Sequence, residues 1–191
     1  MRQQGFSLIE LVVVVTVIGI LIVAGAFEYM DWQGRYRVES QIKQMYADLL
    51  KAKQQAMQTN MPYLVVFSSN GYTICEDSNP ANNSCDAAER AAPSSTSLSK
   101  SGLEYKINWF LAPNPPAANT ILLDQRGLIS PADPNNSNWS AMAQLTKSDN
   151  SSWENGKVDY DCIDISATRI KLGKFDNDGT VCNNMGTCCG R

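Results

Sequence analysis

The sequence contains no histidine among its 191 residues. This absence excludes Ser-His-Asp and Cys-His catalysis, histidine-ligated zinc and a covalently attached c-type haem. Charge is also scarce, because Asp, Glu, Lys and Arg make up only 18% of the chain, against about 25% in an average soluble domain. The formal net charge is -3, which argues against a general polyanion binder, since neutralising phosphates requires clustered lysine and arginine.

The mean hydropathy of -0.26 hides a chain whose apolar residues are segregated at its N-terminus. No charge occurs from Leu11 to Phe27, and Glu10 is the only charge among the 22 residues from Phe6 to Phe27. At about 1.5 Å per residue, a helix of this length spans the roughly 30 Å hydrocarbon core of a bilayer. A lone segment in lipid must satisfy its backbone internally, so a helix is expected despite the many valines.

Two simpler interpretations of this run remain open. A cleaved secretory signal would end at a small-x-small site, which Ala24-Gly25-Ala26 offers weakly. A plain membrane anchor is the second interpretation. Neither explains the carboxylate of Glu10, because a charge inside an apolar span is costly and indicates a functional site with a partner.

The first fifteen residues read MRQQG-FSLIE-LVVVV. They resemble the class III signal of type IV prepilins and type II secretion pseudopilins, in which a short charged leader ends in glycine. In that signal an aromatic residue follows the glycine, a glutamate lies four positions later, and an unbroken apolar run comes next. The matching positions are Gly5, Phe6 and Glu10.

This resemblance implies that a prepilin peptidase cuts between Gly5 and Phe6 and methylates the new Phe6 amine. Residues 1–5 are then the leader, and residues 6–27 are a retained transmembrane and filament-core helix. In a filament the carboxylate of Glu10 needs a cation, and the family model supplies the Phe6 amine of a neighbouring subunit. Because breaking a buried pair costs about 3–5 kcal/mol, Glu10 is expected to favour the correct register of assembly.

After residue 27 the chain becomes polar, but an apolar helical period persists. Steps of three and four residues place six apolar side chains on one helix face, and Tyr46, Leu50 and Met57 should widen the stripe. We expect one helix from about residue 7 to residue 60, in which 28–60 is amphipathic and packs on the head; it ends before Pro62. The six stripe residues are Val38, Ile42, Met45, Leu49, Ala52 and Ala56.

Residues 61–191 are expected to form a β-rich extracytoplasmic head, so the fold class is α+β and type IV pilin-like. Two β-type runs between Tyr63 and Cys75 flank Asn70-Gly71, a strong hairpin signal. The stretch from the Ala-rich helix end to this hairpin resembles the FimT/GspH-type subgroup of minor pilins and pseudopilins. We expect further strands at 103–111, 158–165, 167–174 and 180–182 and a hairpin at 120–129. The expected loops are 77–100, 112–119 and 131–156, the last with a short helix near 139–145.

The six cysteines lie in two groups. An even number in an extracytoplasmic head indicates disulfides, and proximity favours Cys75–Cys85. In the second group, Cys162 or Cys182 is expected to bond Cys188 or Cys189. A zinc site of four cysteines is the alternative, although the sequence has no C-x-x-C pair.

A calcium site is the one cofactor that the sequence leaves open. Asp176-Asn177-Asp178-Gly179 is similar to a fragment of an oxygen-ligand calcium loop, and Asp159 and Asp161 offer further carboxylates. The glutamate that closes an EF-hand loop is missing, and acidic-glycine tetrads are common hairpin turns. Calcium at Asp176 and Asp178 and an ordinary turn therefore remain alternatives.

Together these features predict a non-enzymatic minor pilin or pseudopilin of a type IV pilus or type II secretion filament. Its expected partners are other pilin subunits, the prepilin peptidase, the inner membrane and the inner-membrane assembly platform. Its head would be periplasmic, and later part of a cell-surface pilus or a periplasmic pseudopilus. The alternative is a filament-tip module for adhesion or DNA uptake. Trp139 and Trp153 lie in polar loops, where they either bind a ligand or pack under the loop, and DNA is disfavoured because Arg191 is the only basic residue near the C-terminus.

Overall fold

The computed structural model describes most of the chain in separate ranges. These are residues 7–78, 85–86, 97–112, 119–131, 140–147, 149, 151, 158–176 and 187–190. For residues 24–31, 110–112, 140, 176, 187, 189 and 190 the structure describes the backbone but not the side chains. The chain divides into two compact units, residues 1–37 and 38–191, and the first helix runs from one into the other.

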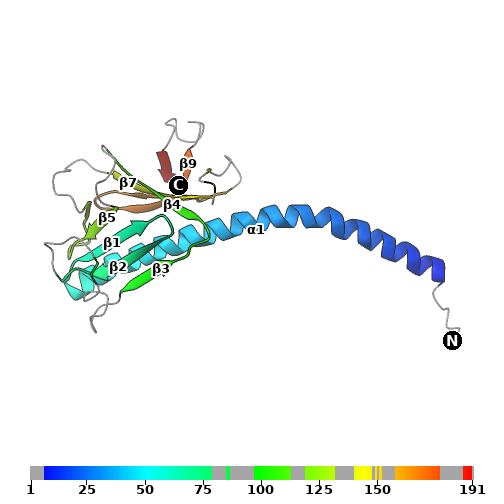
Figure 1. Ribbon diagram of the computed structural model, residues 1–191, viewed down its shortest axis with the longest axis horizontal. Helices are drawn as coiled ribbons and strands as arrows, with labels where there is room; N and C mark the ends of the chain where they lie inside the picture. Colours follow the sequence, from blue (N-terminus) through cyan, green and yellow to red (C-terminus); the bar gives the residue numbers. More distant parts are fainter. Residues whose placement is uncertain are drawn as a thin grey trace. The chain divides into compact units, whose positions relative to one another are not determined.

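The expected long helix is confirmed as α1 (Leu8–Thr59; Figure 1). Asn60 follows with φ 55°, a left-handed conformation that commonly ends helices and that asparagine tolerates better than most residues. All six stripe residues from Val38 to Ala56 are at most 1% exposed. The stripe is narrower than expected, because Leu50 and Met57 are exposed. Each lies one position beyond a buried residue, and one residue turns a helix by about 100°.

The first sheet has five antiparallel strands in the order β3-β2-β1-β5-β6. The hairpin around residue 70 is confirmed, since β1 (Tyr63–Ser68) pairs with β2 (Gly71–Glu76) through a turn at residues 69 and 70. The hairpin expected at 120–129 is also present as β5 (Thr120–Leu123) and β6 (Ile129–Pro131). β3 (Leu98–Ser101) corrects the predicted 77–100 loop at its end, because its residues pair with β2.

The second sheet is also antiparallel and five-stranded, in the order β10-β9-β8-β7-β4. Its strands β4, β8 and β9 lie near the predicted strands 103–111, 158–165 and 167–174. The predicted strand 180–182 lies outside the described residues. β10 is a strand that the sequence analysis did not indicate. The bounds are β4 (Lys106–Ala112), β7 (Ser140–Thr146), β8 (Cys162–Ile165), β9 (Ile170–Asp176) and β10 (Thr187–Gly190).

The helix expected near residues 139–145 is wrong, because this segment is β7, an interior strand between β4 and β8. Ala141, Ala143 and Leu145 alternate along it and are at most 1% exposed. Alanine, methionine, glutamine and leucine all favour helices in isolation. Pairing on both edges overrides this preference and makes 140–146 part of the core rather than of a polar loop.

One hydrophobic core joins the buried stripe of α1 to both sheets. It combines helix residues such as Ile42 and Leu49 with Val65 and Ile121 of the first sheet and Ile163 of the second. The predicted α+β fold class is therefore confirmed, with the helix packed on antiparallel sheets.

Candidate functional site

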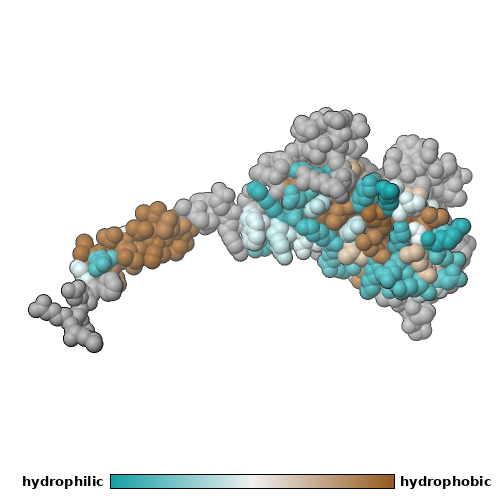
Figure 2. Space-filling model, turned by 180° about the vertical axis from the view of Figure 1, so that it is seen from behind, coloured by the Kyte–Doolittle hydropathy of each residue, from teal (hydrophilic) through white to brown (hydrophobic). Residues whose placement is uncertain are grey.

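The beginning of α1 exposes a continuous apolar surface (Figure 2). The large apolar side chains from Leu8 to Val23 are between 47 and 81% exposed. Thr16 supplies the one hydroxyl of this stretch, and it donates a hydrogen bond to the carbonyl oxygen of Val13 at 2.8 Å. The Thr16 hydroxyl is thus satisfied within the helix and does not interrupt the apolar surface formed by its neighbours.

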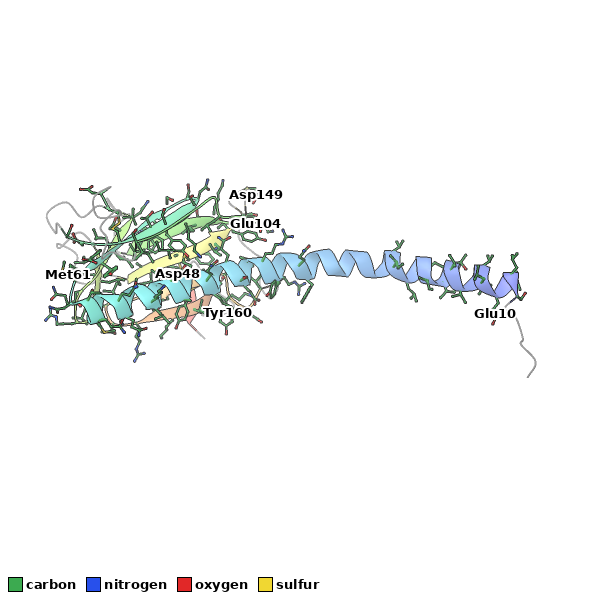
Figure 3. All side chains as sticks on the ribbon, turned by 90° about the horizontal axis from the view of Figure 1, so that it is seen from below. Glu10, Asp48, Met61, Glu104, Asp149 and Tyr160 are labelled. Atoms are coloured by element: carbon green, nitrogen blue, oxygen red, sulfur yellow. A yellow bond between two sulfur atoms is a disulfide. The ribbon has the colours of Figure 1, made fainter. Side chains whose placement is uncertain are left out.

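Glu10 lies in the first turn of α1, near its start in Figure 3. The backbone N–H of Glu10 donates to the carbonyl oxygen of Ser7 at 3.1 Å. A carboxylate is favourable here because the N-terminus of a helix carries partial positive charge.

Gly5 and Phe6, the expected cleavage and methylation positions, lie outside the described residues. Within the part of the chain that the structure describes, no helix combines the length and apolar character needed to cross a membrane.

The second half of α1 is fixed to the first sheet by Asp48 (Figure 3). Its Oδ2 accepts a hydrogen bond from the Tyr72 hydroxyl at 2.7 Å and lies 3.4 Å from the ammonium of Lys100. Tyr72 and Lys100 are register partners on β2 and β3. One carboxylate therefore links the helix to two strands. Burial, with the Asp48 hydrogen bond and charge, raises the pKa of Tyr72 far above its usual range, so the hydroxyl remains a donor.

Other α1 side chains bind backbone groups of the head. The Gln41 amide donates to the carbonyl oxygen of Tyr105 at 2.9 Å and accepts from its N–H at 3.2 Å. Glu39 accepts from the N–H of Asp159 at 3.0 Å, and Lys53 donates to the carbonyl oxygen of Thr168 at 2.8 Å. These contacts span long stretches of sequence and orient α1 against the strands and turns of the head.

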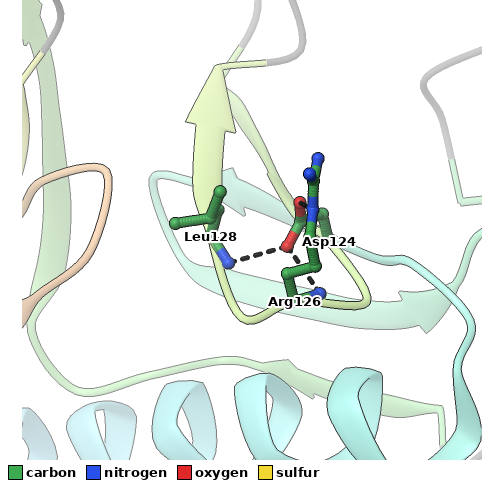
Figure 4. Close-up of polar contacts among 3 residues, drawn as sticks. All are labelled: Asp124, Arg126 and Leu128. Atoms are coloured by element: carbon green, nitrogen blue, oxygen red, sulfur yellow. Dashed lines mark hydrogen bonds and ion pairs between the residues drawn. The ribbon is translucent and has the colours of Figure 1, made fainter.

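A compact turn joins β5 and β6 (Figure 4). Oδ1 of Asp124 accepts from the N–H of Arg126 at 2.9 Å and from that of Leu128 at 2.7 Å. Gly127 has φ 75°, which glycine adopts without strain, and a Cβ there would lie 2.8 Å from Sδ of Met57. The turn therefore packs against the end of α1. Asp124 is needed to accept the two N–H groups, and Gly127 is needed for the positive φ and the close approach to Met57.

Two disulfides are found among the described residues of the head. Cys75 of β2 bonds Cys85, the pair that proximity favours, and Cys162 of β8 bonds Cys188 of β10. Because Cys162 and Cys188 are bonded to each other, they are not ligands of a four-cysteine zinc site. Cys182 lies outside the described residues, and the side chain of Cys189 is among those not described.

The acidic candidates are not brought together among the residues whose side chains are described. Asp178 lies outside the described residues and the side chain of Asp176 is not described, so the calcium site stays a prediction. Asp159 is exposed, whereas Asp161 is 1% exposed. No group of three or more Cys, Asp or Glu residues in the described part of the chain is placed to hold a metal ion.

Asp161 is a buried carboxylate directly before β8, and it contacts β9. Its Oδ1 accepts a hydrogen bond from the N–H of Phe175 at 2.6 Å, while its Oδ2 is enclosed without a hydrogen-bond partner. Burial raises the pKa of Asp161 to about 6, although the Phe175 hydrogen bond and the nearby Lys174 charge act in the opposite direction. From the sequence this residue is expected only as a candidate calcium ligand; its burial depends on β9, which lies further along the chain.

A groove of about 340 Å³ lies where the end of β1 meets β4. The Trp109 ring stacks on the Phe67 ring, with centroids 4.3 Å apart and an interplanar angle of 16°. Sequence reasoning directed attention to Trp139 and Trp153, which lie outside the described residues. It missed this groove because its walls come from segments about forty residues apart. The residues that line it are Phe67, Ser68, Ser69, Ile107, Asn108, Trp109 and Asn119.

Comparison with known proteins gives one family match, at the N-terminus. Residues 1–26 match the model described as the prokaryotic N-terminal methylation motif. No curated protein and no solved structure gives a significant match. The motif, the long helix behind it and the antiparallel head define a non-enzymatic structural protein. This motif is that of type IV pilins and pseudopilins, which are processed through it, and the helix packed on antiparallel sheets is a pilin-like α+β fold. A leader of this kind implies inner-membrane anchoring and delivery to an extracytoplasmic filament.

Proposed function

We propose that the chain is a minor pilin or pseudopilin of the FimT/GspH type, cut between Gly5 and Phe6 and methylated at Phe6. Residues 6–27 hold the processed subunit in the inner membrane. The assembly platform then transfers it into a type IV pilus or a type II secretion pseudopilus, where it contacts other pilin subunits. The expected helix-to-hairpin junction at residues 47–74 supports the subgroup.

The observation that carries this proposal is the exposed apolar surface of Leu8–Val23. Monomeric soluble proteins rarely expose contiguous apolar patches larger than a few hundred Å². A helix that is apolar on all sides is stable when lipid or other helices surround it. Both surroundings are available to a pilin subunit, first in the membrane and then in the filament core.

Glu10 is the charged group on this surface, and we assign it to assembly. In the filament core its carboxylate pairs with the methylated, still protonated Phe6 amine of a neighbouring subunit. A buried charge left without its partner is strongly destabilising. The pair therefore favours the subunit register in which both charges meet.

Processing is tested by mass spectrometry of the full chain, expressed with its prepilin peptidase. The expected N-terminus is Phe6 carrying one methyl group. A Gly5→Val variant should retain the leader and lack the methyl group. An intact leader in the unaltered chain, or cleavage elsewhere, contradicts the assignment of Gly5 and Phe6.

Assembly is tested by counting subunits in purified filaments. Glu10→Ala should remain in the membrane fraction but enter filaments at least about tenfold less. Losing the buried ion pair costs about 3–5 kcal/mol, and each 1.4 kcal/mol of lost assembly free energy corresponds to a factor of about ten. Thr16→Val is the matched control, since it changes a polar residue of the same stretch and should assemble normally. Equal incorporation of Glu10→Ala and the unaltered chain would remove the role of Glu10 while leaving the cleavage result intact.

A further inference from the structure

The groove between β1 and β4 has a preformed frame (Figure 1 shows both strands). On one side, the N–H of Phe67 donates to the carbonyl oxygen of Asn119 at 2.7 Å. On the other side, the N–H of Ile107 donates to the carbonyl oxygen of Ser69 at 2.9 Å. These backbone bonds hold three lining segments together, so the shape of the groove does not depend on side-chain rotamers alone.

The wall of the groove is an aromatic stack. Phe67 is 2% exposed and lies beneath the half-buried Trp109 ring. Because Phe67 fixes the indole from one side, Trp109 is a rigid platform for an apolar face. The indole Nε1 of Trp109 is enclosed and has no hydrogen-bond acceptor in the described structure. Because this nitrogen is enclosed, the indole contributes apolar ring surface to the groove rather than a hydrogen-bond donor.

The other lining residues are polar but uncharged. Two serines and two asparagines, Ser68, Ser69, Asn108 and Asn119, provide hydroxyl and amide groups, and none of the seven lining residues carries a charge. A phosphate, sulfate or carboxylate would therefore find no cation in the lining. The chemistry favours a neutral ligand with an apolar face for the indole and hydroxyl groups for the amides.

We propose that this groove binds a neutral saccharide, with a sugar ring against Trp109 and its hydroxyl groups bonded to the asparagine and serine lining. A volume of about 340 Å³ lies at the lower end of the roughly 300–1,000 Å³ that small-molecule sites occupy. The site thus holds one or a few sugar units rather than a long polymer. This binding belongs to the head and does not depend on how the subunit assembles.

The first experiment screens the full chain, solubilised in detergent, on an array of neutral and acidic oligosaccharides. Retention of one or more neutral glycans, unchanged when salt is raised, is expected because no charge lines the groove. Binding restricted to acidic glycans, or no binding to any glycan, overturns the proposal. A neutral extended peptide, acetyl-Thr-Val-Thr-Val-amide, is tested in parallel. If it perturbs Trp109 while no glycan does, the groove takes peptides instead.

The second experiment places the bound glycan in the groove. Saturation-transfer NMR with the best neutral glycan should show transfer from aromatic protons to the sugar ring protons. Asn108→Ala and Asn119→Ala should each weaken binding about fivefold, the loss expected for one hydrogen bond of about 1 kcal/mol. Asn119→Ala keeps the backbone carbonyl that bonds Phe67, so the frame of the groove is retained.

Trp109→Phe keeps an aromatic ring but reduces the apolar surface that the groove offers to a sugar ring, and it should also weaken binding. Ser130→Ala on β6, outside the groove, is the control and should bind as the unaltered chain does. Near-ultraviolet circular dichroism establishes that each variant is folded. Unchanged affinity in all three groove variants would place the glycan elsewhere and refute the assignment.

Discussion

The Asp48 carboxylate on α1 accepts a hydrogen bond of 2.7 Å from the Tyr72 hydroxyl on β2, across an interval of 24 residues. The same oxygen lies 3.4 Å from the Lys100 ammonium on β3. The second half of α1 is therefore tied to the edge of the first sheet by one charged group.

Removing the Tyr72 hydroxyl should destabilise the head measurably. Tyr72→Phe keeps the buried ring but loses a hydrogen bond to a charged group, worth about 1.5–3 kcal/mol. Lys100→Met should cost less, about 0–1 kcal/mol, because ion pairs near the surface contribute little. Urea unfolding of both variants and of the double variant gives the coupling. Equal losses in the two single variants would mean that the hydroxyl bond is not the main link.

Gly71 is required for close strand packing rather than for the turn. Its φ is not among the positive values found in the described residues, and a Cβ there would collide with the carbonyl oxygen of Lys100 on the paired strand. Gly71→Ala should therefore lower stability by about 1–3 kcal/mol, as overpacking does. Thermal unfolding measures this loss.

The control for this substitution is Gly34→Ala. A Cβ at Gly34 in α1 meets no atom within 4 Å, and alanine is favoured over glycine in a helix interior by about 1 kcal/mol. This variant should lose no stability. If Gly71→Ala were as stable as Gly34→Ala, β3 would have to shift away from β2, which hydrogen exchange at Ser99 and Ser101 would reveal.

Local periodicity predicted the elements whose residues carry their own signal. The helix stripe from Val38 to Ala56 follows from spacing alone, and the first hairpin follows from two β-type runs around a turn. β7 could not be predicted in this way, because its helix-favouring residues become a strand only between β4 and β8. The need for glycine at position 71 could not be predicted either, because it depends on the carbonyl oxygen of Lys100, which lies 29 positions away from Gly71.

The candidate functional features also differ in whether the sequence alone could predict them. The N-terminal motif is contiguous, so Gly5, Phe6 and Glu10 are visible as a pattern, and the family match at residues 1–26 covers them. The Asp48 link and the Phe67–Trp109 groove unite distant segments, and only the packing of the two sheets with α1 reveals them.

The two disulfides should contribute unequally to stability. Cys75–Cys85 closes a separation of 10 residues, and Cys162–Cys188 closes 26. Restricting the unfolded chain predicts about 3 kcal/mol for the shorter loop and about 3.5 kcal/mol for the longer one. Paired serine substitutions at each bond, followed by urea unfolding, measure both. Peptide mapping without reductant verifies that the remaining bond is unchanged, and a larger loss from the shorter loop would contradict the entropic explanation.

Ionisation of Asp161 should make the head less stable as pH rises from about 4 to about 6. Its folded-state pKa of about 6 lies above the usual 3.8, so the native state binds more protons than the unfolded state in this window. The free energy of unfolding then falls with pH, by about 3 kcal/mol for two pKa units. The favourable contribution is fully present below pH 3.8 and is lost as pH rises through about 6.

Asp161→Asn tests this dependence directly. The amide oxygen can still accept the 2.6 Å bond from the N–H of Phe175, but it carries no charge to desolvate, so most of the fall in stability should disappear. Burial also raises the pKa of Asp164 on β8, so Asp164→Asn is the matched control for a second carboxyl three residues away. Urea unfolding at several values between pH 4 and pH 8 compares the three proteins. A slope that persists in Asp161→Asn but vanishes in Asp164→Asn would transfer the titration to Asp164, whereas the buried, half-satisfied carboxyl of Asp161 predicts the reverse.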